Sequence, residues 1–196
     1  MKRVFAMIAG VALVLVTGTG VTLALWNDSE TIDGVAIRSG VLMLDIGGQT
    51  EYDMGTVDTL YPGAVTATRL ELNGHASGNL GLDYVLTSVL TDTSSASSAL
   101  FGVVDAQVYV QSSASAECAT SGVPGGTQVY GAAGGYSDLA ALSVTESLVS
   151  TTELANTDYL CVRLTIPAGT SATVDGVELS DATSSFILNF AGEGIR

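Results

Sequence analysis

The chain has 196 residues, with six Lys or Arg, 20 Asp or Glu and one His, and its formal net charge is −14 at pH 7. So few cations exclude a nucleic-acid binder that is held by phosphate contacts, and one His with two Cys excludes a structural zinc site. Hydrophobic residues make up 47% of the chain and charged residues 13%, which favours a folded domain over a disordered tail or a coiled coil.

The first 24 residues have the layout of an export signal. Lys2 and Arg3 precede an uncharged run over residues 4–26, which is apolar at first and then rich in Gly and Thr. Small side chains near residue 24 predict cleavage between Ala24 and Leu25. A retained membrane anchor is the alternative, because a run of this length is long enough to cross a bilayer.

Cleavage at this site removes two cations and no acid. The mature chain then carries four cations against 20 anions, a net charge of −16. We therefore expect an acidic, secreted protein that is located outside the cell or on its surface. Its length is sufficient to bury one substantial core, and we expect one folded domain over residues 39–196.

Apolar and polar residues alternate with a period of two along most of the mature chain, which predicts half-buried β-strands. The predicted strands are 36–46, 51–57, 66–72, 80–87, 103–110, 127–130, 160–166, 172–179 and 186–190. One helical turn is predicted at 137–142, whereas the runs 91–98 and 112–135, rich in small and polar residues, are predicted to be surface loops. Strands at this spacing predict an all-β fold, an antiparallel β-sandwich or jelly roll.

Two stretches near the N-terminus resemble one family of secreted proteins. Trp26-Asn27-Asp28 follows a Gly-rich signal end, and Gly40-Val41-Leu42-Met43-Leu44 comes shortly after it. Both are similar to the TasA/camelysin family of biofilm-matrix fibre proteins, whose signal is cut by a signal peptidase of the SipW type. Leu60-Tyr61-Pro62-Gly63 and the stretch 185–190 resemble a turn and the closing strand of the same family. Pro62 and Gly63 also fit the two middle positions of a type II turn, which predicts a turn here from the residues themselves.

The resemblance implies an exported jelly-roll subunit of an extracellular fibre. It implies that residues 25–38 are freed by the signal peptidase and donated as a strand to the next subunit, giving a homopolymer in contact with matrix or cell-wall components. The apolar positions of this donor segment are Leu25, Trp26, Ile32, Val35 and Ile37. The chain departs from the family in being short, almost free of Lys, and in carrying two Cys.

The pattern of segment 25–38 is unusual for a strand of its own domain, because residues 27–31 are polar. About 12 extended residues reach roughly 40 Å, enough to cross a neighbour's sheet and to pair with a free strand edge. Head-to-tail donation does not close on itself, so it yields a filament. The alternative is that the segment forms the first strand or a frayed tail of a monomer, with Trp26 folded onto its own core.

Cys118 and Cys161 are the only cysteines. Exported chains fold in oxidising surroundings, so we expect a disulfide between the two. This bond would tether the Ser- and Gly-rich stretch to a strand. Two buried free thiols are the alternative.

No catalytic or metal-ligating motif is visible in the sequence. His75, the only His, lies in a stretch that predicts a solvated turn, so neither a zinc-peptidase helix nor a Ser-His-Asp triad can be proposed. The aspartates lack calcium-loop spacing, which favours solvated carboxylates over weak calcium sites. We therefore expect no enzyme and no cofactor.

A monomeric secreted module that binds carbohydrate or protein is the alternative to a fibre subunit. A sugar-stacking platform would have to come from the scattered aromatic residues Trp26, Tyr61, Tyr109, Tyr130 and Tyr136. Packing in the core or in loops is the commoner role for residues of this kind.

Overall fold

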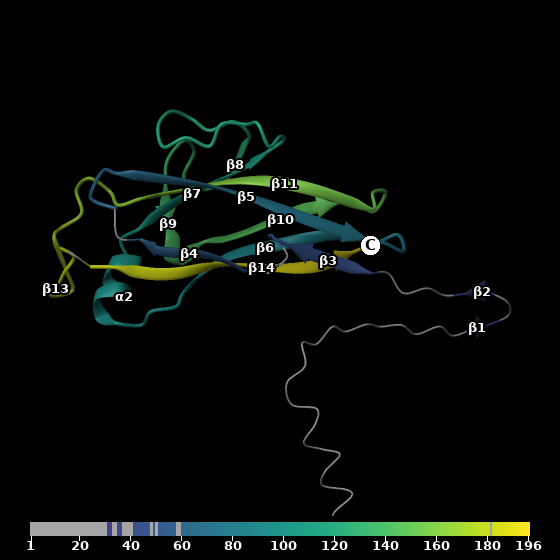
Figure 1. Ribbon diagram of the computed structural model, residues 1–196, viewed down its shortest axis with the longest axis horizontal. Helices are drawn as coiled ribbons and strands as arrows, with labels where there is room; N and C mark the ends of the chain where they lie inside the picture. Colours follow the sequence, from purple (N-terminus) through teal and green to yellow (C-terminus); the bar gives the residue numbers. More distant parts are fainter. Residues whose placement is uncertain are drawn as a thin grey trace, which may run out of the picture. The chain divides into compact units, whose positions relative to one another are not determined.

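The computed structural model describes residues 31–32, 35–36, 41–47, 49, 51–57, 60–180 and 182–196. The chain divides into two units, residues 1–39 and residues 40–196. In the first unit, β1 (Thr31–Ile32) pairs antiparallel with β2 (Val35–Ala36). The second unit contains all the remaining elements (Figure 1).

The second unit is an antiparallel β-sandwich, which confirms the fold class expected from the alternating pattern. One sheet has the strand order β10 (Ser143–Val149), β6 (Gly81–Leu90), β14 (Ser184–Ile195) and β4 (Glu51–Val57). The other has the order β3 (Leu42–Asp45), β5 (Val65–Ala76), β11 (Ala155–Thr165), β7 (Asp105–Gln111) and β8 (Thr127–Tyr130), with β9 (Ser137–Asp138) also paired to β7. The narrower jelly-roll topology stays a prediction.

The core lies between the two sheets and is built from the inward residues of the long strands. Leu70 and Leu72 of β5 and Leu160, Val162 and Leu164 of β11 are buried there. From β6 and β14 of the other sheet, the buried side chains are Leu82, Tyr84, Leu86, Phe186, Leu188 and Phe190. The ring centroids of Tyr84 and Phe190 are 6.2 Å apart, so the aromatic pair joins β6 to β14 within this layer.

β11 differs from its predicted half-buried state, because both of its faces are covered. Its outward residues Cys161, Arg163 and Thr165 are only 0%, 6% and 7% exposed. The Arg163 guanidinium donates hydrogen bonds to carbonyl groups of the stretch between β7 and β8, and this stretch therefore lies over the outer face. Alternation predicts which residues face the core, but it cannot show that a distant loop covers the opposite face.

Two predicted elements are wrong, and two strands, β9 and β10, are missed. The predicted loop 91–98 contains the start of helix α2 (Ser95–Phe101), and the predicted strand 172–179 is the hairpin of β12 (Thr173–Val174) and β13 (Val177–Glu178). β10 was not predicted, because Glu146 occupies an inward position between two buried residues and breaks the apolar pattern. The predicted helical turn is the short 3-10 helix η1 (Leu139–Ala141).

Helix α2 depends on caps and packing rather than on its Ser-rich sequence. The side chain of Ser94 accepts a hydrogen bond of 3.2 Å from the Ser97 amide, which caps the first turn. Ser97 donates to Ser184 at 3.1 Å, and the ring centroids of Phe101 and Phe186 are 5.6 Å apart. These contacts attach the helix to the start of β14.

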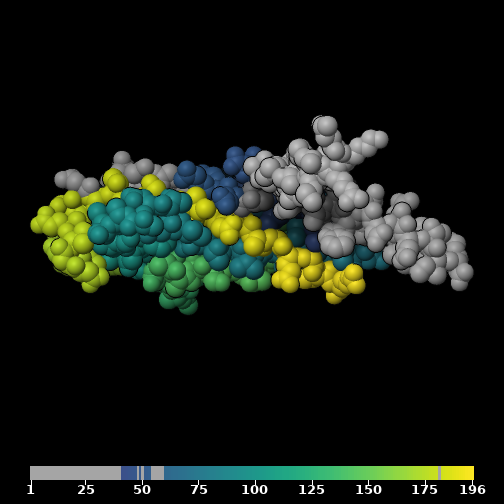
Figure 2. All heavy atoms as spheres, turned by 90° about the horizontal axis from the view of Figure 1, so that it is seen from below, coloured from purple at the N-terminus to yellow at the C-terminus, as the bar shows by residue number. Residues whose placement is uncertain are grey.

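The sandwich has two distinct ends, which we call the α2 end and the β3 end. At the α2 end lie α2, the β12–β13 hairpin and the start of β5 (Figure 1), and α2 and the hairpin are neighbours on the surface in Figure 2. At the β3 end, Leu42 pairs with Ala76, the last residue of β5, and Ile195 pairs with Gly81. The chain enters the sandwich and ends at this same end.

Candidate functional site: an open sheet edge and the pocket beside it

The outer edge of β5 is only partly paired. β5 has 12 residues, and β11 pairs with its inner side from Val65 to His75. On the outer side, β3 pairs only with Asn73 to Ala76. Over residues 65–72, no other strand in the described part of the chain pairs with this side. We call this stretch the open edge; its eight residues span about 27 Å.

The first sheet, unlike the second, has an edge strand toward the α2 end. β4 pairs with the first half of β14, from Ser184 to Asn189, and therefore lies toward the α2 end. β3 lies at the opposite end, and the turn between the two strands is closed by mutual backbone bonds of Ile46 and Gln49. On this side of the sandwich, the α2 half has a strand in the first sheet and no described partner strand in the second.

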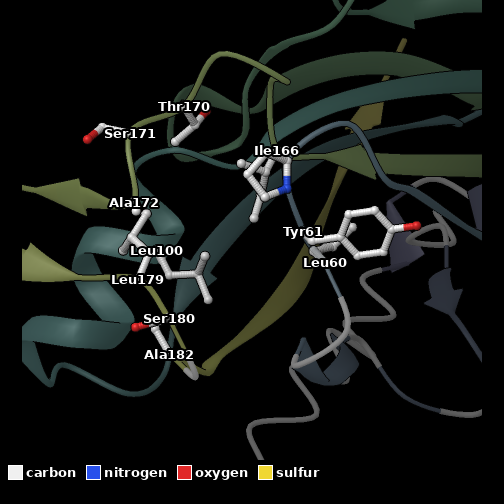
Figure 3. A pocket seen from close by; sticks show the side chains of 11 residues that line it. Leu60, Tyr61, Leu100, Ile166, Thr170, Ser171, Ala172, Leu179, Ser180 and Ala182 are labelled. Carbon is white, nitrogen blue, oxygen red and sulfur yellow. The ribbon is translucent and has the colours of Figure 1, made fainter.

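A pocket of about 550 Å³ lies at the α2 end, next to the start of β5 (Figure 3). Apolar side chains form most of its walls, chiefly Leu60, Leu100, Ile166 and Leu179. Hydroxyl groups of Thr170, Ser171 and Ser180 lie around it, and none of the lining residues is charged. The pocket therefore suits an uncharged, largely apolar group.

The turn between the pocket and β5 is held in place by backbone bonds. The amide of Ala64 donates to the Tyr61 carbonyl at 2.9 Å and Gly63 has φ +86°, which confirms the Pro-Gly turn predicted from the sequence. The Gly63 amide donates to Ile166 at 2.8 Å. Tyr61 itself is 69% exposed, and its hydroxyl points away from the pocket in Figure 3.

The predicted donor segment is only partly described. Ala24, Leu25, Trp26 and Ile37, and with them the predicted cleavage site, lie outside the described residues. Ile32 belongs to β1 and pairs with Val35 of β2. The backbone thus turns back on itself between these strands, whereas the sequence predicts one extended strand. In the described part of the chain, no helix is long and apolar enough to span a bilayer.

Cys118 and Cys161 form a disulfide, as expected, with sulfur atoms 2.07 Å apart and Cα atoms 5.4 Å apart. Cys161 is fully buried in the centre of β11, and Cys118 lies in the stretch that follows β7. The bond ties that stretch to the outer face of the second sheet. A disulfide is compatible with a protein that leaves the reducing cytosol.

Two arginines hold the same stretch through its carbonyl groups, a role that the sequence analysis missed. The guanidinium of Arg163 donates to Thr120 at 2.9 Å and to Gly122 at 3.0 Å, and it lies 5.6 Å from the ring centroid of Tyr136. Arg69 donates to the carbonyls of Ala114 and Ala116. Arg69 and Arg163 are the only Lys or Arg residues between residues 39 and 195. This scarcity is the feature of the sequence that could have indicated a special role for them.

The layer between the sheets contains two carboxyl groups, those of Glu146 and Asp158, and the phenol of Tyr84. Glu146 pairs with Tyr84 across β10 and β6, and Asp158 occupies an inward position of β11 opposite Leu72. Burial first, and then the charge of Glu146, raises the pKa of Asp158 to about 6, although Tyr84 partly offsets the rise. The Tyr84 hydroxyl is buried without a hydrogen-bond partner of good geometry in the described part of the chain.

His75 lies in β5 between Met43 and Ala155 of the neighbouring strands, so the predicted solvated turn is wrong. The prediction failed because Gly74 suggested a turn, whereas this glycine is a strand residue facing Leu148, where a side chain would not fit. Within the described residues, no group of three or more His, Cys, Asp or Glu is placed to hold a metal ion.

The four tyrosines considered for sugar stacking do not gather at one site. Tyr109 is 3% exposed and its hydroxyl faces Gln128, and Tyr130 donates to the Asp138 carbonyl. Tyr136 packs against Arg163, and only Tyr61 is beside the pocket. These residues therefore form no common platform.

No protein-family model matches this chain, and a search of curated proteins returns no match either.

Proposed function

We propose that the mature protein is a secreted, non-enzymatic subunit of an extracellular fibre or matrix, and that segment 25–38 of one subunit pairs with the open edge of the next. The observation that carries this proposal is the eight-residue stretch of β5 that has no described partner strand. An unpaired edge presents backbone N–H and C=O groups that favour addition of a strand. Segment 25–38 is long enough to supply one.

The position of β3 defines how the donated strand would run. β3 is antiparallel to β5 and occupies its last four residues. A strand that continues the line of β3 along residues 72 to 65 is also antiparallel and ends at the α2 end. The donor's folded unit then lies beyond the α2 end of the acceptor, with its own β3 end nearest. This arrangement is head-to-tail and extends into a filament.

Two features of the sequence and two of the structure support export and assembly. Residues 1–24 have the layout of an export signal, and residues 26–28 and 40–44 resemble the TasA/camelysin fibre proteins. The Cys118–Cys161 disulfide is compatible with an oxidising environment. The apolar residues Val41, Leu42 and Met43 are 53%, 38% and 59% exposed. They form an apolar surface where the chain enters the sandwich.

Donation has to open the pairing between β1 and β2. This pairing involves only Thr31 with Ala36 and Ile32 with Val35. A two-residue hairpin is marginal in water, whereas a strand added to a sheet gains pairing along its whole length. The exchange is therefore favourable when an acceptor edge is available.

Electron microscopy of the mature protein with and without residues 25–36 tests the proposal. Filaments are expected from the mature chain and not from the deletion variant. Ser29→Pro with Thr31→Pro removes two backbone donors and should also prevent filaments, whereas Ser29→Ala with Thr31→Ala, which keeps both backbone donors, is the control that keeps them. Filaments that survive the deletion would rule donation out.

Size-exclusion chromatography separates this function from that of a monomeric binding module. A fibre subunit elutes as a ladder of sizes that shifts with protein concentration. A binding module elutes as one monomeric species at every concentration. The deletion variant serves as the size standard for the monomer.

A further inference from the structure

We infer that the pocket at the α2 end receives the side chains of Val35 and Ile37 from a second copy of this chain. The inference rests on the proposed function and adds a specific contact to it. It concerns the last residues of the donated segment, just before the donor's own folded unit begins.

Register places the pocket where the donated strand ends. β5 starts at Val65, and the turn Tyr61–Ala64 joins it directly to the pocket wall. A strand that runs antiparallel along the open edge reaches Val65 with its C-terminal residues. The segment's last residues, up to Arg38, are therefore the part of the donor that meets the pocket.

The spacing of two apolar residues in the donor segment places them on one face of an extended strand. Val35 and Ile37 are two positions apart, so their side chains point to the same face of an extended strand. Ile32 is three positions before Val35 and points to the opposite face. Two aliphatic side chains from one face match a pocket whose walls are mainly aliphatic and whose lining has no charge.

The charge of the molecule also favours an apolar partner over an anionic one. The mature chain carries four cations against 20 anions, and none of these cations is among the pocket residues. An anionic ligand would meet repulsion from the acidic surface without a compensating charge in the pocket. Val35 and Ile37 bring no charge of their own into it.

The two ends of neighbouring copies are complementary in the proposed arrangement. The donor's β3 end exposes Val41, Leu42 and Met43, and the acceptor's α2 end contains the apolar pocket and the exposed Tyr61. Between Ile37 and Val41 there are only three residues, so a filled pocket brings these two surfaces close together. The pocket contact thus extends an interface that strand pairing begins.

Filling the pocket tests the inference on the full mature chain. Ala172 is an exposed residue of the pocket lining, so Ala172→Phe places a ring in the hollow without removing core packing. We expect this variant, and also Val35→Asp with Ile37→Asp, to weaken association about tenfold or more in sedimentation measurements. Ala133→Phe, in an exposed loop, and Ile32→Asp, on the opposite face of the donor, are the matched controls and should change it less.

A coupled pair of variants distinguishes contact from general damage. In the double variant Ile37→Ala with Ala172→Phe, the smaller donor side chain leaves room for the new ring in the pocket. Its loss of association free energy should therefore be smaller than the sum of the losses of the two single variants. Circular dichroism melts of the variants at a concentration where they are monomeric show whether each one folds. Unchanged association of Ala172→Phe, or additive losses in the double variant, would overturn the inference.

The outcomes separate this inference from the proposed function. If deletion of residues 25–36 abolishes filaments but Ala172→Phe has no effect, strand donation stands and the pocket contact is wrong. If the mature chain stays monomeric with and without the segment, both are wrong. Loss of association in Ala172→Phe together with a positive coupling supports both.

Discussion

Asp158 is a carboxyl group in an environment that its residue type does not prefer. It sits among inward-facing residues, with Glu146 as a second carboxyl group and no cation among the inward-facing residues beside it on β6, β10 and β11. Its raised pKa means that the folded state binds its proton more tightly than the unfolded chain does. The stabilisation is therefore present at low pH and is lost as the pH rises through about 6.

Asp158→Asn should remove this pH dependence. The amide is neutral at every pH, so the free energy of unfolding at pH 7.5 is expected to rise by about 1 kcal/mol, once solvent screening of a half-buried carboxylate is allowed for. At pH 4 the substitution should have little effect. Urea unfolding at both pH values measures this, with the exposed Glu193→Gln as control. A variant that loses stability equally at both pH values would contradict the account.

At the scale of elements, the stretch between β7 and β8 acts as a cover for the second sheet. It is fixed by the disulfide, by Arg163 and by two buried glutamines. Gln107 donates to the Gly135 carbonyl at 2.6 Å, and Gln111 donates to Glu117 at 2.8 Å and to Gly125 at 3.1 Å. Buried polar groups that are paired in this way hold one defined loop conformation.

Arg163→Lys should be much more destabilising than Arg69→Lys. Arg163 is 6% exposed and satisfies two carbonyls and Gln107 with one planar group, which an ammonium cannot reproduce. We expect a loss of about 2–4 kcal/mol in the free energy of unfolding for Arg163→Lys, and less than about 1 kcal/mol for the exposed Arg69. Denaturant titration of both variants checks this. Equal losses in the two variants would contradict the claim that the buried contacts of Arg163 stabilise the fold.

The sequence predicts the elements that obey local rules and misses those decided by distant contacts. The bounds of β4 and β8 agree with prediction, and so does the Pro62–Gly63 turn, because strand alternation and turn chemistry are local. α2 was missed because its stability comes from packing on β14, and the outer face of β11 was misjudged because a remote loop covers it. The open edge could not be predicted at all, because it depends on the relative lengths of β3 and β5.

At the scale of the whole molecule, the net charge opposes assembly. The mature charge of −16 repels neighbouring subunits over a screening distance of about 8 Å at physiological salt. Protonation of carboxyl groups, among them Asp158, reduces this repulsion as the pH falls. Acid and salt should therefore both favour the fibre.

Light scattering of the mature protein should show more association at pH 4 than at pH 8. The difference is expected to shrink at about 1 M salt, where the screening distance falls to about 3 Å. The variant without residues 25–36 is the control, and its scattering should depend much less on pH. Equal association at pH 4 and pH 8 in low salt would contradict the electrostatic part of the account.

Cross-linking between isotopically distinct copies tests most directly whether the N-terminal segment of one molecule completes the sheet of another. A photoreactive residue in place of Ile32 is activated in an equal mixture of unlabelled and ¹⁵N-labelled mature protein, and peptides linked to β5 are identified by mass spectrometry. We predict that about half of the cross-links to residues 65–72 join an unlabelled segment to a labelled strand or the reverse, as random donation between copies requires. Cross-links found only between peptides of the same isotope would show that each segment pairs within its own molecule, and they would contradict strand donation.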